Sequence, residues 1–83
     1  MPNNMLRENW EDLANAIVLS AVQDFRTAYY RLKKNPKSKM AAGEVEALVR
    51  FFTSKYYSLL TNSLDGETLV KKLIKEVEEK INA

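Results

Sequence analysis

Apolar residues recur every three or four positions along three stretches of the chain, which is the spacing of the buried face of an α-helix. The first stretch runs from about Asn4 to Lys34, contains no proline or glycine, and would form a helix roughly 45 Å long. It carries two apolar stripes, which are Val18, Val22, Phe25, Tyr29 and Leu32 in one and Trp10, Leu13, Ile17, Ala21 and Ala28 in the other. Two stripes need two sets of neighbours, so this stretch predicts self-association.

Asn35 and Pro36 end the first helix, because the residue before a proline is pushed away from helical angles and proline has no backbone N–H to donate. A second helix follows a candidate cap at Ser38, with apolar residues at helical spacing, which are Val45, Leu48, Val49, Phe52, Tyr56 and Leu59. Its far half, residues 51–60, is rich in residues that favour strands, but no other segment alternates with a period of two and could pair with it. We therefore expect a kinked or split helix here.

A last helix is predicted from a cap at Asp65 to about Asn82, after a turn at residues 61–64. Its apolar face consists of Leu69, Val70, Leu73, Ile74, Val77 and Ile81. The pattern predicts one all-α domain over residues 1–83, a small bundle of three to four helices with a long first helix. A domain of 83 residues buries only about 60% of its unfolded surface, so we expect homo-oligomerisation to complete the bundle.

Composition narrows the chemistry that this domain can perform. The chain has no cysteine and no histidine, which excludes disulfides, Cys/His zinc sites, thiol nucleophiles and the usual general base near neutral pH. Its carboxylates form no pair suited to acid–base catalysis, and its serines have no histidine to activate them. We therefore expect a protein that is not an enzyme and that uses no metal and no cofactor. No signal segment begins the chain, and Asn15 and Ser20 interrupt its longest apolar run, which predicts a cytoplasmic protein outside the membrane.

The most distinctive polar feature is a run of cations at the end of the first predicted helix. Six positive side chains and no acid lie between residues 26 and 39, namely Arg26, Arg31, Lys33, Lys34, Lys37 and Lys39. Tyr30 shares the outer face of that helix with several of them, and cations around an aromatic ring suit phosphates and stacked bases. A plainer interpretation is that bases at a helix C-terminus only complement the helix dipole. The net charge of +2 is weak for broad nucleic-acid binding, so a compact anionic ligand or an acidic protein surface fits better.

Three adjacent aromatic pairs stand out in so short a chain, namely Tyr29-Tyr30, Phe51-Phe52 and Tyr56-Tyr57. Neighbouring helical residues point about 100° apart, so one member of each pair can enter the core while the other faces a groove or a partner. We predict Tyr29, Phe52 and Tyr56 in the core and Tyr30, Phe51 and Tyr57 in more exposed positions. Together with the second stripe of the first helix, this predicts an oligomer interface made of Trp10, Leu13, Ile17, Ala21, Phe51 and Tyr57.

Four segments of the chain carry a resemblance to a known group of proteins. They are Ala21-Val22-Gln23-Asp24-Phe25-Arg26, Asn35-Pro36, Arg50-Phe51-Phe52-Thr53-Ser54, and Leu60 followed by Asp65-Gly66-Glu67-Thr68-Leu69. In this arrangement the chain resembles small uncharacterised proteins encoded by phages and mobile elements of Gram-positive bacteria. The resemblance implies a protein that acts by binding, as phage proteins do that block host defence enzymes or sequester nucleotide signals.

Our leading hypothesis is therefore a non-enzymatic, phage-type homo-oligomer that antagonises a defence system in the cytoplasm of a bacterial host. It would either block the nucleic-acid site of a host protein or sequester a nucleotide signal, through Arg26, Tyr30, Arg31, Lys33, Lys34, Lys37 and Lys39. One alternative is a DNA- or RNA-binding regulator. Another is a structural assembly module whose basic segment is only a solvated helix end.

Overall fold

The computed structural model describes the backbone of residues 2–61 and 64–82, and the side chains of residues 10–61 and 64–82. Its elements are α1 (Pro2–Lys34), α2 (Lys39–Phe52), α3 (Lys55–Leu60) and α4 (Gly66–Asn82). No strand occurs in these described ranges, which confirms the prediction of a small all-α bundle. None of the helices found there combines the length and the apolar character that crossing a bilayer requires.

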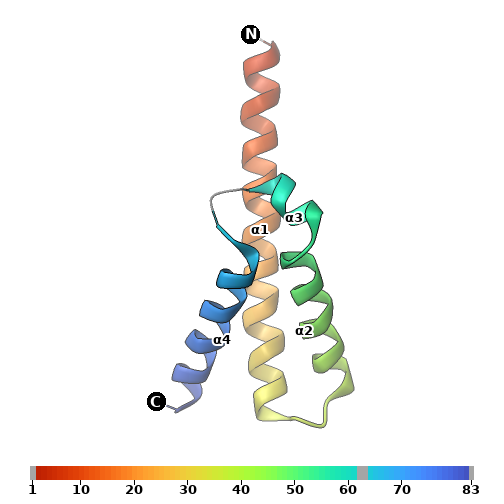
Figure 1. Ribbon diagram of the computed structural model, residues 1–83, viewed down its shortest axis with the longest axis vertical. Helices are drawn as coiled ribbons and strands as arrows, with labels where there is room; N and C mark the ends of the chain where they lie inside the picture. Colours follow the sequence, from red (N-terminus) through yellow and green to blue (C-terminus); the bar gives the residue numbers. More distant parts are fainter. Residues whose placement is uncertain (1, 62–63, 83) are drawn as a thin grey trace.

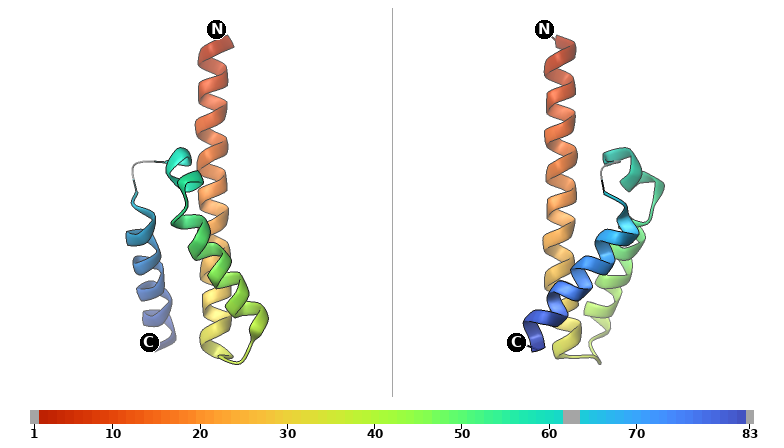
Figure 2. Two further views of the ribbon diagram at one scale, coloured as in Figure 1. Left: turned by 45° about the vertical axis from the view of Figure 1, so that its right-hand side comes forward. Right: turned by 60° about the vertical axis from the view of Figure 1, so that its left-hand side comes forward.

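The helices form an elongated bundle built around α1. Helices α2 and α4 flank the C-terminal half of α1, and the short α3 lies near its middle (Figure 1); all three contact α1. The N-terminal part of α1 extends beyond the other helices in every view (Figure 2). The molecule measures 51 × 25 × 17 Å and has a radius of gyration of 14.9 Å, compared with about 12 Å for a compact chain of this length. Part of α1 therefore stands outside the bundle.

The core lies where α1, α2 and α4 meet. Phe25 of α1 and Phe52 of α2 are fully buried and pack edge to face, with their ring centroids 6.3 Å apart. Around these rings lie Ala21, Val22, Tyr57, Val70 and Leu73. An aromatic pair with this geometry stabilises a core by about 0.5–1.5 kcal/mol beyond simple burial. The apolar faces predicted for the first and last helices are thus faces that build the core.

A break at Thr53 and Ser54 separates α2 from α3, which confirms the predicted split of the second helix. The Ser54 hydroxyl donates to the carbonyl oxygen of Phe51 at 2.6 Å and accepts from the N–H of Tyr57 at 3.2 Å. The break rotates the helical register, so Tyr57 is 2% exposed in the core while Tyr56 is 50% exposed. The predictions of Tyr56 in the core and Tyr57 at an oligomer interface are therefore wrong, because they continued the spacing of α2 through the break.

The helix caps predicted at Ser38 and Asp65 are confirmed. Ser38 Oγ accepts from the N–H of Ala41 at 3.2 Å, and Asp65 Oδ2 accepts from the N–H and the hydroxyl of Thr68 at 3.0 and 2.9 Å. Both hydrogen bonds lower the pKa of Asp65, because they stabilise its carboxylate form. The bond from the Thr68 hydroxyl has the larger effect, and the bond from the Thr68 N–H follows. The turn predicted at residues 61–64 includes residues 62–63, which lie outside the described residues.

Helix α4 begins with Gly66 pressed against the end of α2. A Cβ atom at this position would overlap the carbonyl oxygen of Phe52 and lie 2.7 Å from its carbonyl carbon. Only glycine leaves room for so close an approach of two backbones. Gly66 therefore sets how tightly α4 docks on α2.

Candidate anion-binding site at the end of α1

The basic segment, residues 26–39, forms the end of the bundle where the chain turns from α1 to α2. The N–H of Asn35 donates to the carbonyl oxygen of Arg31 at 2.8 Å, and the N–H of Ser38 donates to that of Asn35 at 3.0 Å. These bonds make a tight turn directly after Lys34, the last residue of α1. The last turn of α1 and the first turn of α2 therefore lie together at one end of the molecule, the lower end in Figure 1.

Tyr30 lies in the middle of the candidate site, in the exposed position that was predicted for it. The Nζ atom of Lys34 lies 5.5 Å from the centroid of the Tyr30 ring, which is a cation–π contact. One hollow, about 330 Å³ in volume, is lined by Tyr30, Arg31, Lys34, Asn35 and Ser38. A second hollow, about 390 Å³, is lined by Arg26, Thr27, Tyr30, Arg31, Val77 and Lys80. Tyr30 and Arg31 border both hollows and connect them.

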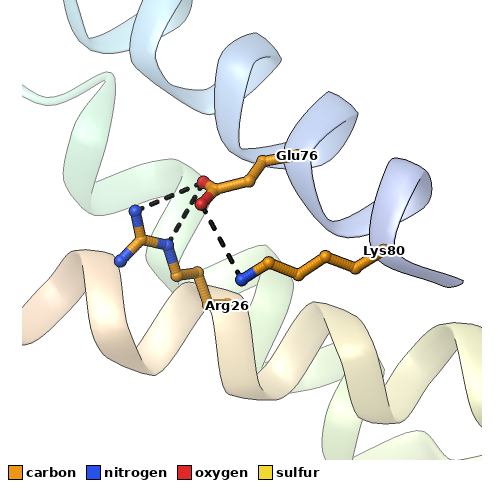
Figure 3. Close-up of polar contacts among 3 residues, drawn as sticks. All are labelled: Arg26, Glu76 and Lys80. Atoms are coloured by element: carbon orange, nitrogen blue, oxygen red, sulfur yellow. Dashed lines mark hydrogen bonds and ion pairs between the residues drawn. The ribbon is translucent and has the colours of Figure 1, made fainter. Parts of the chain in front are cut away.

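Two of the predicted cations are engaged by α4. Both Nε and Nη2 of Arg26 lie 3.2 Å from Oε2 of Glu76, and Nζ of Lys80 lies 3.9 Å from the other oxygen of the same carboxylate (Figure 3). Nζ of Lys33 lies 3.6 Å from Oε2 of Glu78. The Arg26 and Lys33 pairs are half-exposed, so each stabilises the docking of α4 by about 0–1 kcal/mol. Their positive charges are largely neutralised within the fold.

Sequence reasoning missed these acidic partners, because Glu76 and Glu78 lie among lysines along the chain. The signal that could have found them is their position on either side of Val77, which is buried. Residues that flank a buried helical position lie at the edge of the contact with the neighbouring helix. The packing of α4 therefore reduces the free charge of the basic segment from six cations to four.

The four remaining cations form no ion pair within the described residues: Arg31, Lys34, Lys37 and Lys39. All four are exposed. The first turn of α2 has no acidic residue to offset the positive end of its helix dipole. Unpaired cations beside a helix N-terminus create a positive potential that attracts anions, so this end of the bundle can bind an anionic group.

The residues predicted for an oligomer interface lie on two parts of the surface and in the core. Trp10 and Leu13 are 49% and 54% exposed on the part of α1 outside the bundle. A hollow of about 470 Å³ between α1 and α2, the α1–α2 groove, is lined by Ala16, Ile17, Ser20, Ala21, Asp24, Leu48 and Phe51. It brings together the predicted residues Ile17, Ala21 and Phe51, of which Ala21 is only 8% exposed and also packs in the core. Tyr57 is in the core and does not join them.

Hydroxyl groups elsewhere serve capping and packing. Those of Ser54 and Ser58 donate to the carbonyl oxygens of Phe51 and Lys55, both at 2.6 Å. The hydroxyl of Tyr57 is buried with no hydrogen-bond partner among the described residues. Burial raises the pKa of the Tyr57 phenol, and the negative charge of Asp65 raises it further by a smaller amount. In the described part of the chain, no three acidic side chains gather where they could hold a metal ion.

The chain matches no protein-family model, no curated protein and no solved structure. Its function must therefore be argued from the site itself.

Proposed function

We propose that the protein is a non-enzymatic binding protein that takes up a phosphate-bearing nucleotide at the basic end of the bundle. The observation that carries this proposal is the arrangement around Tyr30. Lys34 lies against the Tyr30 ring and Arg31 lines the same hollow. Neither cation has an ion-pair partner among the described residues, so both are available to a ligand.

Each of these three side chains matches one part of a nucleotide. The planar guanidinium of Arg31 can hold two phosphate oxygens at once, and the ammonium of Lys34 has three N–H donors. The ring of Tyr30 offers a face on which a base can stack, an interaction worth about 1–3 kcal/mol. The two hollows that Tyr30 borders, about 330 and 390 Å³, are at the small end of the range of about 300–1,000 Å³ for ligand pockets. A small ligand with a base and a few phosphates fits this combination.

The biological role that we propose is antagonism of a host defence system by sequestering a nucleotide signal in the bacterial cytoplasm. The resemblance to phage and mobile-element proteins supports this context. Blocking the nucleic-acid site of a host protein fits less well, because such a site is itself basic and would repel the four unpaired cations. The positive charge of these four cations thus favours a nucleotide as the ligand over the nucleic-acid site of a host protein.

In this proposal the protein binds the nucleotide and does not act as an enzyme. The chain has no histidine or cysteine, and the hydroxyls of Ser54 and Ser58 are used by backbone carbonyls. The hollow beside Lys34 is lined by two cations, one phenol, one amide and one hydroxyl group, which suit binding of an anion. We also propose that the protein acts as a homo-oligomer, which would carry one such site per copy.

Native mass spectrometry of the protein purified gently from a bacterial host tests the proposal. We expect an added mass that matches a nucleotide, and we expect it to be lost in a variant with Arg31→Glu and Lys34→Glu. A variant with Lys55→Glu and Lys72→Glu changes the charge equally at two exposed positions outside the site, and it should retain the ligand. A nucleotide that stays bound to the first variant would refute the site.

Two other outcomes separate the alternative functions. Binding to random duplex DNA that weakens steeply as salt rises would indicate a nucleic-acid-binding regulator. A stable oligomer that carries no added mass, and that binds no nucleotide supplied in excess, would indicate a structural assembly module.

A further inference from the structure

We propose that two copies of the chain form an antiparallel dimer, in which the projecting part of each α1 lies in the α1–α2 groove of the other copy. The surface involved differs from the candidate anion site, so this inference stands independently of the proposed nucleotide binding. Four observations support it: the surface area, the spacing of one stripe of α1, the sizes of the side chains along it, and the distribution of charge.

The protein exposes more surface than a compact monomer of its mass. Its accessible surface is 6374 Å² for a mass of 9.6 kDa, whereas a folded monomer of that mass exposes about 5,100 Å². The difference, about 1,300 Å², is larger than the ~800 Å² that each partner buries in an interface of standard size. The surface in excess of a compact monomer is therefore large enough for an interface of standard size.

The stripe of α1 that leads from its projecting part into the groove has a symmetric spacing. It passes through Trp10, Leu13, Ile17, Ala21 and Asp24, with steps of three, four, four and three residues. A second helix that runs in the opposite direction and is centred on Ile17 has the same steps. Leu13 then lies opposite Ala21 of the second copy, and Ile17 lies opposite its own counterpart. A two-fold dimer requires this self-matching, because the same surface is used by both copies.

The sizes of the side chains along the stripe are complementary. Trp10 and Leu13 are large and exposed outside the bundle, whereas small residues at positions 16, 20 and 21 line the floor of the groove. Leu48 and Phe51 form its α2 side, so a large side chain entering from a second copy would be covered by apolar atoms. In this alignment Trp10 reaches Asp24 of the second copy, whose carboxylate can accept a hydrogen bond from the indole N–H.

Charge selects the antiparallel over the parallel arrangement. A parallel pair centred on the same stripe would bring the four unpaired cations of each basic end side by side, and these would repel one another. The antiparallel pair holds the two basic ends at opposite ends of the dimer. The dimer therefore carries two separate candidate anion sites, one at each end.

Single-cysteine cross-linking tests the alignment, because the chain contains no cysteine of its own. An Ile17→Cys variant should form a disulfide-linked dimer, since the two-fold axis brings this position close to its counterpart and a disulfide needs Cα atoms within about 7 Å. The matched control is Leu19→Cys, which is 63% exposed but lies on a different face of α1 and should stay monomeric on a non-reducing gel. A mixture of Trp10→Cys and Asp24→Cys proteins should form a mixed disulfide, and these two exposed positions leave the core unchanged.

Sedimentation equilibrium of the full chain tests the dimer itself. We expect twice the mass of 9.6 kDa, and we expect Trp10→Ala to raise the dissociation constant by about tenfold or more, as for a large aromatic residue that is buried in an interface. Circular dichroism of each variant shows whether its helices are retained. A monomer at all micromolar concentrations would overturn the proposal. So would a dimer that Leu19→Cys links as readily as Ile17→Cys, or one that none of these cysteines links.

Discussion

Replacing Gly66 with alanine is expected to destabilise the protein strongly, because the added methyl group has no room. Its Cβ would overlap the carbonyl oxygen of Phe52, and it would lie 2.7 Å from the Phe52 carbonyl carbon and 3.3 Å from Cδ2 of Tyr57. Non-bonded carbon atoms prefer separations of about 3.5–4.0 Å, so the end of α2 or the start of α4 must move by roughly 1 Å. Neither can move easily, since Phe52 and Tyr57 are both buried.

The expected loss follows from the kind of atoms that clash. Overpacking of a core costs about 1–3 kcal/mol when side chains can adjust, and here the nearest atoms belong to the backbone. We therefore expect a loss of about 3 kcal/mol or more, out of a total stability of about 4–12 kcal/mol for a domain of this length. Each kcal/mol corresponds to about 4–8 °C in the melting temperature. Urea and thermal unfolding, followed by circular dichroism, measure the change.

Gly43 provides a matched control for this substitution. It lies within α2, and the position that its Cβ would occupy has no atom within 4 Å. Alanine there should raise stability by about 0.5–1 kcal/mol, because it restricts the unfolded chain without creating a clash. The same chemical change should thus act in opposite directions at the two sites. A Gly66→Ala protein that unfolds at the wild-type midpoint would refute the close contact between α2 and α4.

The other predictions concern single side chains. Ser38→Ala should lower the free energy of unfolding by about 1 kcal/mol in urea titrations, because the N-cap of α2 is lost, and an unchanged midpoint would contradict the role of this cap. Tyr57→Phe should keep or raise stability by about 1 kcal/mol, because it removes a buried hydroxyl with no partner among the described residues; a clear loss would reveal a partner outside them. The pKa of Tyr57 is raised in the folded state, so the wild type should lose stability as pH rises above about 10, where the unfolded tyrosine ionises. Tyr57→Phe should lessen that loss, and stability profiles against pH that are identical for the wild type and the variant would contradict this effect of Tyr57. Glu76→Gln should lower stability by less than about 1 kcal/mol, and the difference should shrink in high salt; a larger, salt-independent loss would contradict a solvent-screened pair.

Local signals in the sequence were sufficient for most of the fold. Pro36, Ser38 and Asp65 mark helix ends through effects that act within a few residues, so the structure confirms them. The positions of Tyr56 and Tyr57 were predicted wrongly because the break after α2 changes which side of the next helix faces the core. Ser54, a residue that favours N-caps, was the signal for this change of register.

The candidate site was predictable in part. The run of cations is visible along the chain, but the pairing of Arg26 with Glu76 joins residues fifty positions apart and depends on how α4 packs on α1. The α1–α2 groove is likewise a product of packing, since Asp24 and Leu48 come from different helices and share no sequence pattern. Residue types therefore indicated which charges exist, and tertiary contacts decided which of them remain unpaired.

The turn between α1 and α2 has a consequence for finding the natural ligand. The hollow beside Tyr30 takes Arg31 and Lys34 from α1 and Ser38 from the start of α2, so a molecule bound there holds the two ends of a helical hairpin together. Binding only to the folded state at a concentration of 100 times the dissociation constant adds about 2.7 kcal/mol to stability. In a domain of this size, that gain raises the melting temperature by about 10–20 °C. A thermal-shift screen of nucleotides and other small anions would therefore recognise the ligand by how far it delays melting, whatever its chemical identity.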